Sequence, residues 1–365
     1  MKTLNLKNAN FKENNFDFLR FFAASLVIIY HSFPLHDVGG FPGSKILGFL
    51  VKFPLPIFFI ISGFLITKSW IDNPHIITFF KKRVLRIFPA LIAAVLFAIF
   101  LVGPITIGSI DGIKNYFSNP ATWQYAQNIM MRSRFFLPGV FENNIVKGAI
   151  NGSLWTLPIE FWLYISLSFF GYAKLLAKKR FTSILIVIAM YWLYYKLSHD
   201  PAAATLSFLG MPVVWTLKFG IYFYLGSSFY LFREKITFNI LVFLFALAVL
   251  YSYQVEIVFY LTLPYIVLYL ALAVDNKVLK NWGKFGDFSY GLYVYAFPIQ
   301  QMIMHYFGSR ISLPLFFISA YFTTLALAII SWHLIEKPAL RLKKVSITKL
   351  LATKIARIKL IIKKN

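Results

Sequence analysis

The sequence alternates between long apolar stretches and short polar segments along most of its length. A bilayer core is roughly 30 Å thick, so an α-helix that rises about 1.5 Å per residue crosses it with about 20 apolar residues. About ten stretches approach or exceed this length. We predict membrane-spanning helices over residues 16–34, 46–70, 84–107, 153–173, 182–197, 206–231, 237–253, 256–274, 286–307 and 312–336.

The polar segments between these stretches differ regularly in charge, and short loops rich in Lys and Arg stay in the cytoplasm. With a cytoplasmic N-terminus, the inner segments hold most of the basic residues. The outer segments carry only Lys45, Lys114, Arg132, Arg134, Lys147 and Arg310. The pattern therefore predicts an all-α polytopic membrane protein with about ten transmembrane helices and both termini in the cytoplasm.

The composition supports a membrane protein, because 59% hydrophobic residues and a mean hydropathy of +0.69 exceed what one soluble domain can bury. Basic inner loops that face anionic lipid account for the net charge of +24. We find no nucleic-acid motif and expect no nucleic-acid partner. The absence of cysteine excludes disulfides and thiolate metal ligands, and we expect no metal site.

The chain divides into one membrane domain over residues 1–341 and a basic tail over 342–365. In the tail, isoleucines and leucines share one side of a predicted helix, which we expect to lie along the inner membrane surface. The outer segment at 108–152 is longer than most connections between helices. Its aromatic and hydrogen-bonding residues suit either a sugar-binding segment or an ordered cap, and the sequence favours neither.

Two ionisable residues lie in the first apolar stretch, Arg20 near its inner end and His31 near its outer end. Their spacing returns them to within about 20° of the same helix face, roughly 16 Å apart along the axis. Taken singly, Arg20 would extend its charge to the inner interface and His31 would be a hydrogen-bonded histidine. Ionisable residues within a span more often face the protein interior and mark a site.

Three further charges lie at comparable depths. Arg83 and Arg86 are three residues apart at the inner start of the third stretch, so they share one helix face. Glu160 lies about a third of the way into the fourth stretch, where a carboxylate needs a partner or a proton.

These residues resemble the acyltransferase-3 family of bacterial inner-membrane O-acyltransferases, which transfer acyl groups, usually acetyl, to extracytoplasmic carbohydrates. Arg20 and His31 match the family pattern of Arg, ten residues and His, and Arg83 with Arg86 match its Arg-x-x-Arg pattern. Further blocks in the family order are FFIISGFLI at 58–66, GSLWTLPIEF at 152–161, FSYGLYVYAFPI at 288–299 and IEKPAL at 335–340. One departure is Ala296, where many members have a histidine, so we assign no catalytic role there.

The resemblance implies that an acyl group, most often acetyl from cytoplasmic acetyl-CoA, crosses the membrane to a hydroxyl of an extracytoplasmic or lipid-linked carbohydrate. Arg20, Arg83 and Arg86 would bind the acyl-CoA donor, because guanidinium groups form bidentate contacts with phosphates. His31 would accept the hydroxyl proton or carry the acyl group briefly. Glu160 would either orient the His31 ring or bind the acceptor.

The competing hypothesis is a transporter or flippase of a lipid-linked saccharide, which the composition fits equally well. Arg83 and Arg86 favour the acyltransferase, because a phosphate-binding cluster aligned with an outer histidine suits a coenzyme A donor. The sequence leaves open the acceptor glycan, the acyl group and the oligomeric state.

Overall fold

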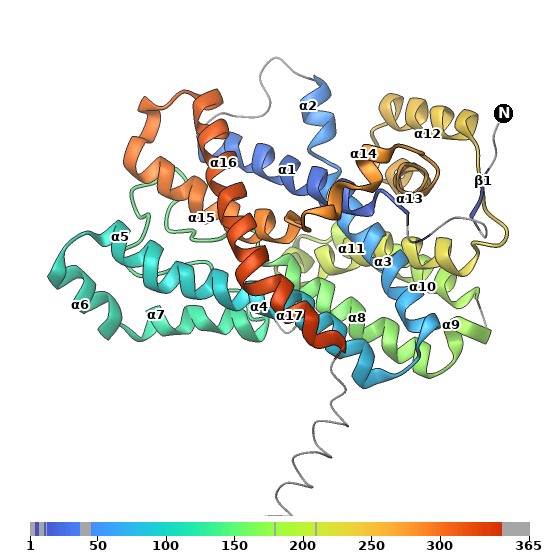
Figure 1. Ribbon diagram of the computed structural model, residues 1–365, viewed down its shortest axis with the longest axis horizontal. Helices are drawn as coiled ribbons and strands as arrows, with labels where there is room; N and C mark the ends of the chain where they lie inside the picture. Colours follow the sequence, from blue (N-terminus) through green and yellow to red (C-terminus); the bar gives the residue numbers. More distant parts are fainter. Residues whose placement is uncertain are drawn as a thin grey trace, which may run out of the picture.

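The computed structural model describes residues 4–6, 11, 13–36, 45–178, 180–208 and 210–344, and most of them are helical (Figure 1). The strands are two short antiparallel pairs. In one pair β1 (Leu4–Asn5) lies beside β4 (Thr237–Phe238), and in the other β2 (Ser207–Phe208) lies beside β3 (Met211–Pro212). The predicted helical class is therefore confirmed.

Helices lie within all ten of the apolar stretches predicted from the sequence. The first half contains α1 (Phe16–Leu35), α2 (Lys45–Leu50), α3 (Pro54–Asp72), α4 (Ile76–Phe97), η2 (Ala98–Val102), α5 (Gly103–Ile107), α6 (Ile110–Ser118), α7 (Pro120–Gln124) and η3 (Tyr125–Met130). The second half contains α8 (Thr156–Tyr172), α9 (Leu175–Lys178), α10 (Thr182–Ser198), η4 (Pro201–Thr205), α11 (Val213–Leu231), α12 (Ile240–Ser252), α13 (Glu256–Leu272), α14 (Lys277–Lys280), η5 (Trp282–Lys284), α15 (Ser289–Phe307), η6 (Gly308–Arg310), α16 (Leu313–Ser331), η7 (Trp332–Glu336), α17 (Lys337–Arg341) and η8 (Leu342–Lys344).

Within the described residues, four helical units are long and apolar enough to cross a membrane. They are Phe16–Leu35, Lys45–Asp72, Ile76–Ile107 and Leu313–Arg341. A fifth would be α13 together with the segment Lys277–Lys284, which are bent by 91° relative to each other. The chain is thus a multi-pass helical membrane protein, while ten crossings and cytoplasmic termini stay predictions. The predicted amphipathic tail lies outside the described residues from position 345 onward.

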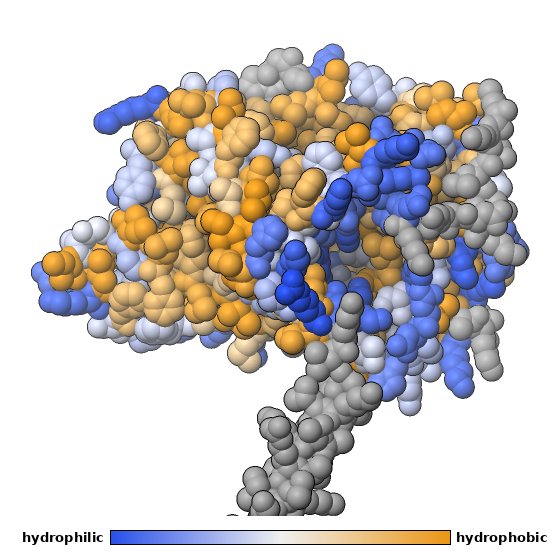
Figure 2. Space-filling view, in the orientation of Figure 1, coloured by the Kyte–Doolittle hydropathy of each residue, from blue (hydrophilic) through white to orange (hydrophobic). Residues whose placement is uncertain are grey.

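Large apolar side chains cover much of the outer surface of the helix bundle. On α10 Leu185 and Ile188 are exposed, and on α12 Leu244 and Phe245 are exposed. Figure 2 shows hydrophobic residues over most of the visible face, with hydrophilic ones gathered in the part that holds α14 and α17. An apolar surface of this extent is typical of helices that face lipid.

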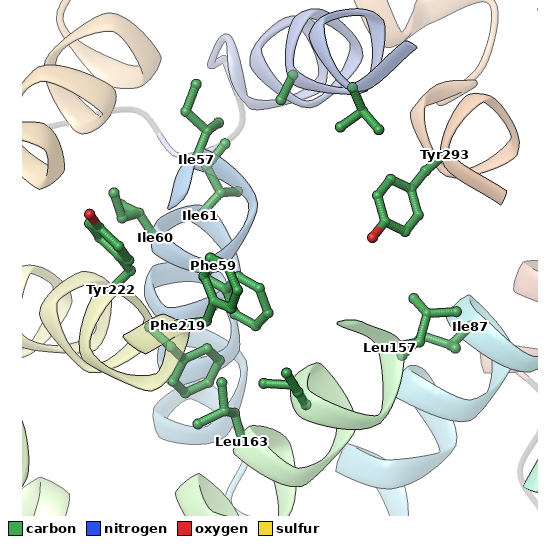
Figure 3. Packing of buried hydrophobic residues seen from close by; sticks show 14 of the residues in the cluster. Ile57, Phe59, Ile60, Ile61, Ile87, Leu157, Leu163, Phe219, Tyr222 and Tyr293 are labelled. Atoms are coloured by element: carbon green, nitrogen blue, oxygen red, sulfur yellow. The ribbon is translucent and has the colours of Figure 1, made fainter. Parts of the chain in front are cut away.

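Helices α3 and α11 pack closely in the centre of the bundle. A side-chain carbon added at Gly63 would lie 1.8 Å from the Phe223 carbonyl oxygen, so only glycine permits this approach. Further along the contact, the rings of Phe59 and Phe219 stack with centroids 4.9 Å apart (Figure 3). The FFIISGFLI block at 58–66 therefore contributes the glycine that lets α3 and α11 approach each other closely.

The start of α1 is held by the end of α13. The Asn15 side-chain amide donates hydrogen bonds to the carbonyl oxygens of Leu270, at 2.8 Å, and Val274, at 2.9 Å. Carbonyl groups in the last turn of a helix have no partner within the helix, so this side chain completes α13. The contact also fixes the position of α1, which carries both Arg20 and His31.

Candidate functional site

A cavity of about 400 Å³ lies among α1, α3, α4, α8 and α15, and we call it the arginine cavity. Its lining includes four of the five residues singled out from the sequence, which are Arg20, Arg83, Arg86 and Glu160. These four come from three different helices, α1, α4 and α8. The shared face predicted for Arg83 and Arg86 is present, since both side chains line this one cavity.

The carboxylate of Asp287 bridges two of these arginines. Its Oδ2 atom lies 2.6 Å from Arg86 Nη2 and 3.5 Å from Arg20 Nη2. The backbone N–H and the hydroxyl of Ser289 both donate to its Oδ1 atom, and Arg20 also pairs with Asp17. Asp287 therefore sets the distance between guanidinium groups that belong to different helices.

Sequence reasoning missed Asp287, although a signal was present. The residue lies at the very start of the predicted span at 286–307 and follows a lysine-rich inner segment. The chain has only 13 acidic residues against 37 basic ones, so a carboxylate in such a position is unusual. Its pairing with two helices from the first third of the chain depends on tertiary packing.

Arg83 differs from the other two arginines, because no carboxylate pairs with it among the described residues. Its Nη2 atom lies 3.5 Å from the Ser69 hydroxyl, and its buried Nε atom has no hydrogen-bond partner in the described part of the chain. The guanidinium group lies over the ring of Tyr164, 5.9 Å from the centroid. A buried cation with unused donors is costly unless a ligand supplies the acceptor.

Glu160 lies in the arginine cavity and does not contact His31. Its Oε1 atom accepts a hydrogen bond of 2.7 Å from the Ser62 hydroxyl and a second one from Tyr164. Both donors line the same cavity. Of the two roles considered for Glu160, orientation of the His31 ring finds no contact in this geometry.

His31 lines a second cavity of about 880 Å³, which we call the histidine cavity. The imidazole packs edge-on against Phe297, with ring centroids 5.1 Å apart, and against Tyr30 at 5.4 Å. Its buried Nδ1 atom has no hydrogen-bond partner among the described residues. This ring nitrogen therefore forms no hydrogen bond with the described residues and is free to accept or donate a proton.

The two cavities meet at Leu55 and Tyr293, which line both of them. The Tyr293 hydroxyl donates to the Ser153 carbonyl oxygen at 2.7 Å and lies 2.5 Å from the Thr156 hydroxyl. Figure 3 shows the Tyr293 ring reaching from α15 into the space between the helices. Leu55 and Tyr293 therefore form part of the wall between a cationic cavity and one that contains a histidine.

The long segment at 108–152 is an ordered cap in the described structure. Asn144 donates to the side-chain oxygen of Gln301 at 2.8 Å, and Trp123 donates to the Phe117 carbonyl oxygen at 2.9 Å. None of the segment's candidate sugar-binding side chains lines either cavity in the described part of the chain. Of the two interpretations that the sequence left open, this packing favours the cap.

The position at which many family members have a histidine lines neither cavity in the described part of the chain. Ala296 packs in a small apolar cluster with Ala24, Ile28 and Ala328.

The fold and the site define a multi-pass helical membrane protein with a cationic cavity next to a histidine-lined one. The chain matches the model of the acyltransferase domain of the acyltransferase-3 family over residues 13–333 and belongs to this family. It is similar to the O-acetyl transferase of Shigella phage Sf6, with 31% identity over 89% of this chain and 96% of that protein. It is also similar to nodulation protein 10 of Rhizobium leguminosarum bv. viciae, with 35% identity over 42% of this chain and 43% of that protein. No solved structure matches the chain.

This membership identifies the protein as an O-acyltransferase, which favours the enzyme over the transporter considered from composition. The motifs that carried the resemblance lie within the matched residues, except the IEKPAL block at 335–340, which follows shortly after them. The two most distant of them in the chain come together in space, since Arg20 and Leu340 of the IEKPAL block both line the arginine cavity.

Proposed function

We propose that the protein transfers an acetyl group from cytoplasmic acetyl-CoA to a hydroxyl of an extracytoplasmic or lipid-linked carbohydrate in the bacterial inner membrane. The donor binds in the arginine cavity and the acceptor enters the histidine cavity. The observation that carries this proposal is the meeting of the two cavities at Leu55 and Tyr293. Helix α1 contributes Arg20 to the first cavity and His31 to the second.

The lining of the arginine cavity suits the phosphates of coenzyme A. Arg83 has unused donors, and Lys82 and Lys343 add positive charge at the same cavity. Guanidinium groups recognise phosphate oxygens through paired, charge-assisted hydrogen bonds. The extended pantetheine arm is of the same order as the roughly 16 Å that separate Arg20 from His31 on an ideal helix. A donor held at the arginines therefore brings its thioester toward the imidazole.

The transfer needs a base, because a neutral alcohol is a weak nucleophile toward a thioester. In the proposed step the acceptor oxygen forms a bond to the acetyl carbonyl carbon, and the carbon–sulfur bond breaks. His31 takes the hydroxyl proton and returns it to the leaving thiolate, so the products are an acetyl ester and coenzyme A. An imidazole with a nitrogen unassigned to the protein suits this role.

The proposal is tested at the donor and at the acceptor separately. Calorimetry on the purified protein should detect binding of acetyl-CoA, and deletion of the gene should remove acetyl esters from the envelope carbohydrate of the source bacterium. Re-expression of the intact chain should restore those esters, whereas re-expression of His31→Ala should not. Unchanged acetylation in the deletion strain would contradict the proposed acceptor class, and absence of acetyl-CoA binding would contradict the proposed donor.

A further inference from the structure

Charged side chains from α11 and α13 meet in the histidine cavity. Lys218 Nζ lies 2.6 Å from Glu256 Oε1, and the Tyr194 hydroxyl donates to Glu256 Oε2 at 2.7 Å. Both charged side chains line the cavity and are partly accessible, with 27% of Lys218 and 34% of Glu256 exposed. Lys218 lies within the apolar stretch predicted to span the membrane at 206–231. A charge inside such a helix is costly and usually serves a site.

Aromatic rings surround this ion pair. Trp215 is 46% exposed, and Lys218 Nζ lies 5.2 Å from the centre of its ring. Trp155 packs edge-on against Trp215 at 5.8 Å, and Phe219 stacks on it at 5.9 Å. The indole is therefore held by Trp155, which directly precedes α8, and by Phe219 from its own helix, while part of its surface is open. An open, braced aromatic ring beside a few polar groups is typical of a ligand pocket.

A second polar pair lies in the same cavity. Lys52 Nζ contacts Gln254 Oε1 at 2.8 Å, and both residues line the histidine cavity. The cavity thus offers ammonium donors, a carboxylate acceptor and an amide next to a tryptophan face. A hydroxyl-rich ring can use both the donors and the acceptors, whereas an acyl chain would form no hydrogen bond with them and a purely anionic ligand could not donate to Glu256.

We infer that Trp215, Lys218 and Glu256 form the acceptor subsite and hold one sugar ring, with Lys52 and Gln254 at a neighbouring position. The C–H face of the sugar packs on Trp215, its hydroxyls accept from Lys218 and donate to Glu256, and a further hydroxyl is left to face His31. This inference rests on the proposed function, since it names what selects the carbohydrate that receives the acetyl group.

The chain contains a matched control for this arrangement. On α10 Lys196 Nζ lies 4.4 Å from the centre of the Trp192 ring, and Trp192 is 58% exposed. This second lysine and tryptophan pair lines neither cavity within the described residues. Substitutions there remove the same chemical groups from a similar helix without touching the inferred subsite.

The test uses the full-length purified enzyme, labelled acetyl-CoA and envelope polysaccharide that has been deacetylated with mild alkali. Trp215→Ala and Lys218→Gln should each raise the KM for the polysaccharide at least about tenfold, while the Kd for acetyl-CoA stays within about twofold. Trp215→Phe keeps an aromatic face and should recover most of the affinity. Trp192→Ala and Lys196→Gln should leave both constants unchanged.

The outcomes separate this inference from the function on which it rests. If the intact enzyme acetylates the polysaccharide and Lys218→Gln has an unchanged KM, the subsite is wrong and the proposed function stands. Equal effects at Lys196 and Lys218 would also overturn it. If the intact enzyme binds acetyl-CoA but does not acetylate the polysaccharide, the acceptor class itself fails. Should Trp215→Ala not fold, the comparison of Lys218→Gln with Lys196→Gln decides the inference by itself.

Discussion

The arginine cavity and the histidine cavity share a wall but differ in the way their charges are compensated. Five cationic side chains and three carboxylates line the first, while two lysines and one carboxylate line the second. In the first cavity Arg83 lacks a carboxylate partner among the described residues, whereas Lys218 in the second is paired directly. The difference indicates that the first cavity is prepared for an anionic ligand and the second for a ligand that both donates and accepts hydrogen bonds.

The assignment of the two cavities to opposite sides of the membrane gives an all-or-none prediction. In Asn143→Cys, an impermeant maleimide should label intact cells, because the loop is expected outside. Lys178→Cys should be labelled only after permeabilisation, since its loop is rich in basic residues. The natural chain has no cysteine, so each variant carries one thiol. Labelling of position 178 but not 143 in intact cells would reverse the two cavities and the mechanism.

The sharpest difference in rate is expected at His31. His31→Ala should lower turnover by about 10² to 10⁴, because a general base contributes this much, while acetyl-CoA affinity changes little. Labelled acetyl transfer and calorimetry measure the two quantities. Arg20→Ala should instead weaken donor binding, and a higher acetyl-CoA concentration should restore part of its rate. If a higher acetyl-CoA concentration restores the turnover of His31→Ala, then His31 is a packing residue and Glu160 becomes the candidate base.

The next largest effect concerns donor affinity. The double variant Arg83→Ala with Arg86→Ala should weaken acetyl-CoA binding at least about tenfold, because charge-assisted hydrogen bonds contribute about 1.5 to 3 kcal/mol each. Arg180→Ala is the control, since this arginine pairs with Glu234 at 3.1 Å and lies outside the cavity lining. Equal Kd values for the double variant and the intact protein would place the donor elsewhere.

The smallest predicted effect is on stability rather than binding. Asp287→Asn leaves Arg86 partly buried without a charge partner, so the free energy of unfolding should fall by about 1 to 3 kcal/mol. Thermal unfolding in detergent measures the change. Asp111→Asn removes an exposed partner of Lys114 and should leave the melting temperature unaltered. A melting temperature for Asp287→Asn equal to that of the intact protein would mean that Asp287 does not hold the arginines.

The sequence could predict the helices and much of the arginine cavity, for physical reasons that concern local spacing. Apolar length predicts where a helix lies, and three-residue spacing places Arg83 and Arg86 on one face. Arg20 and His31 stand out as ionisable residues in one apolar stretch, and the resemblance then supplies their roles. The convergence of Arg20 with Arg83 on one cavity was expected only through their shared role.

The remaining features depend on contacts between helices that are far apart in the chain. Asp287 meets Arg20 across 267 positions, and Lys218 meets Glu256 across a helix and two turns. No local pattern specifies such pairs, because helix packing decides which faces meet. For the same reason, the contact between Glu160 and His31 that one of the two considered roles requires is not formed. Ser62 and Tyr164 instead donate hydrogen bonds to the Glu160 carboxylate.

The wall formed by Leu55 and Tyr293 has a consequence for the cell's energy supply. In the proposed orientation, the two cavities open toward opposite sides of a membrane that holds a proton gradient, and a continuous water path between them would discharge it. The hydrogen bonds of Tyr293 to Ser153 and Thr156 hold its ring in this wall, where it blocks the passage of ions. An acetyl group carries no charge, so in the proposed function its transfer across this wall moves no ions.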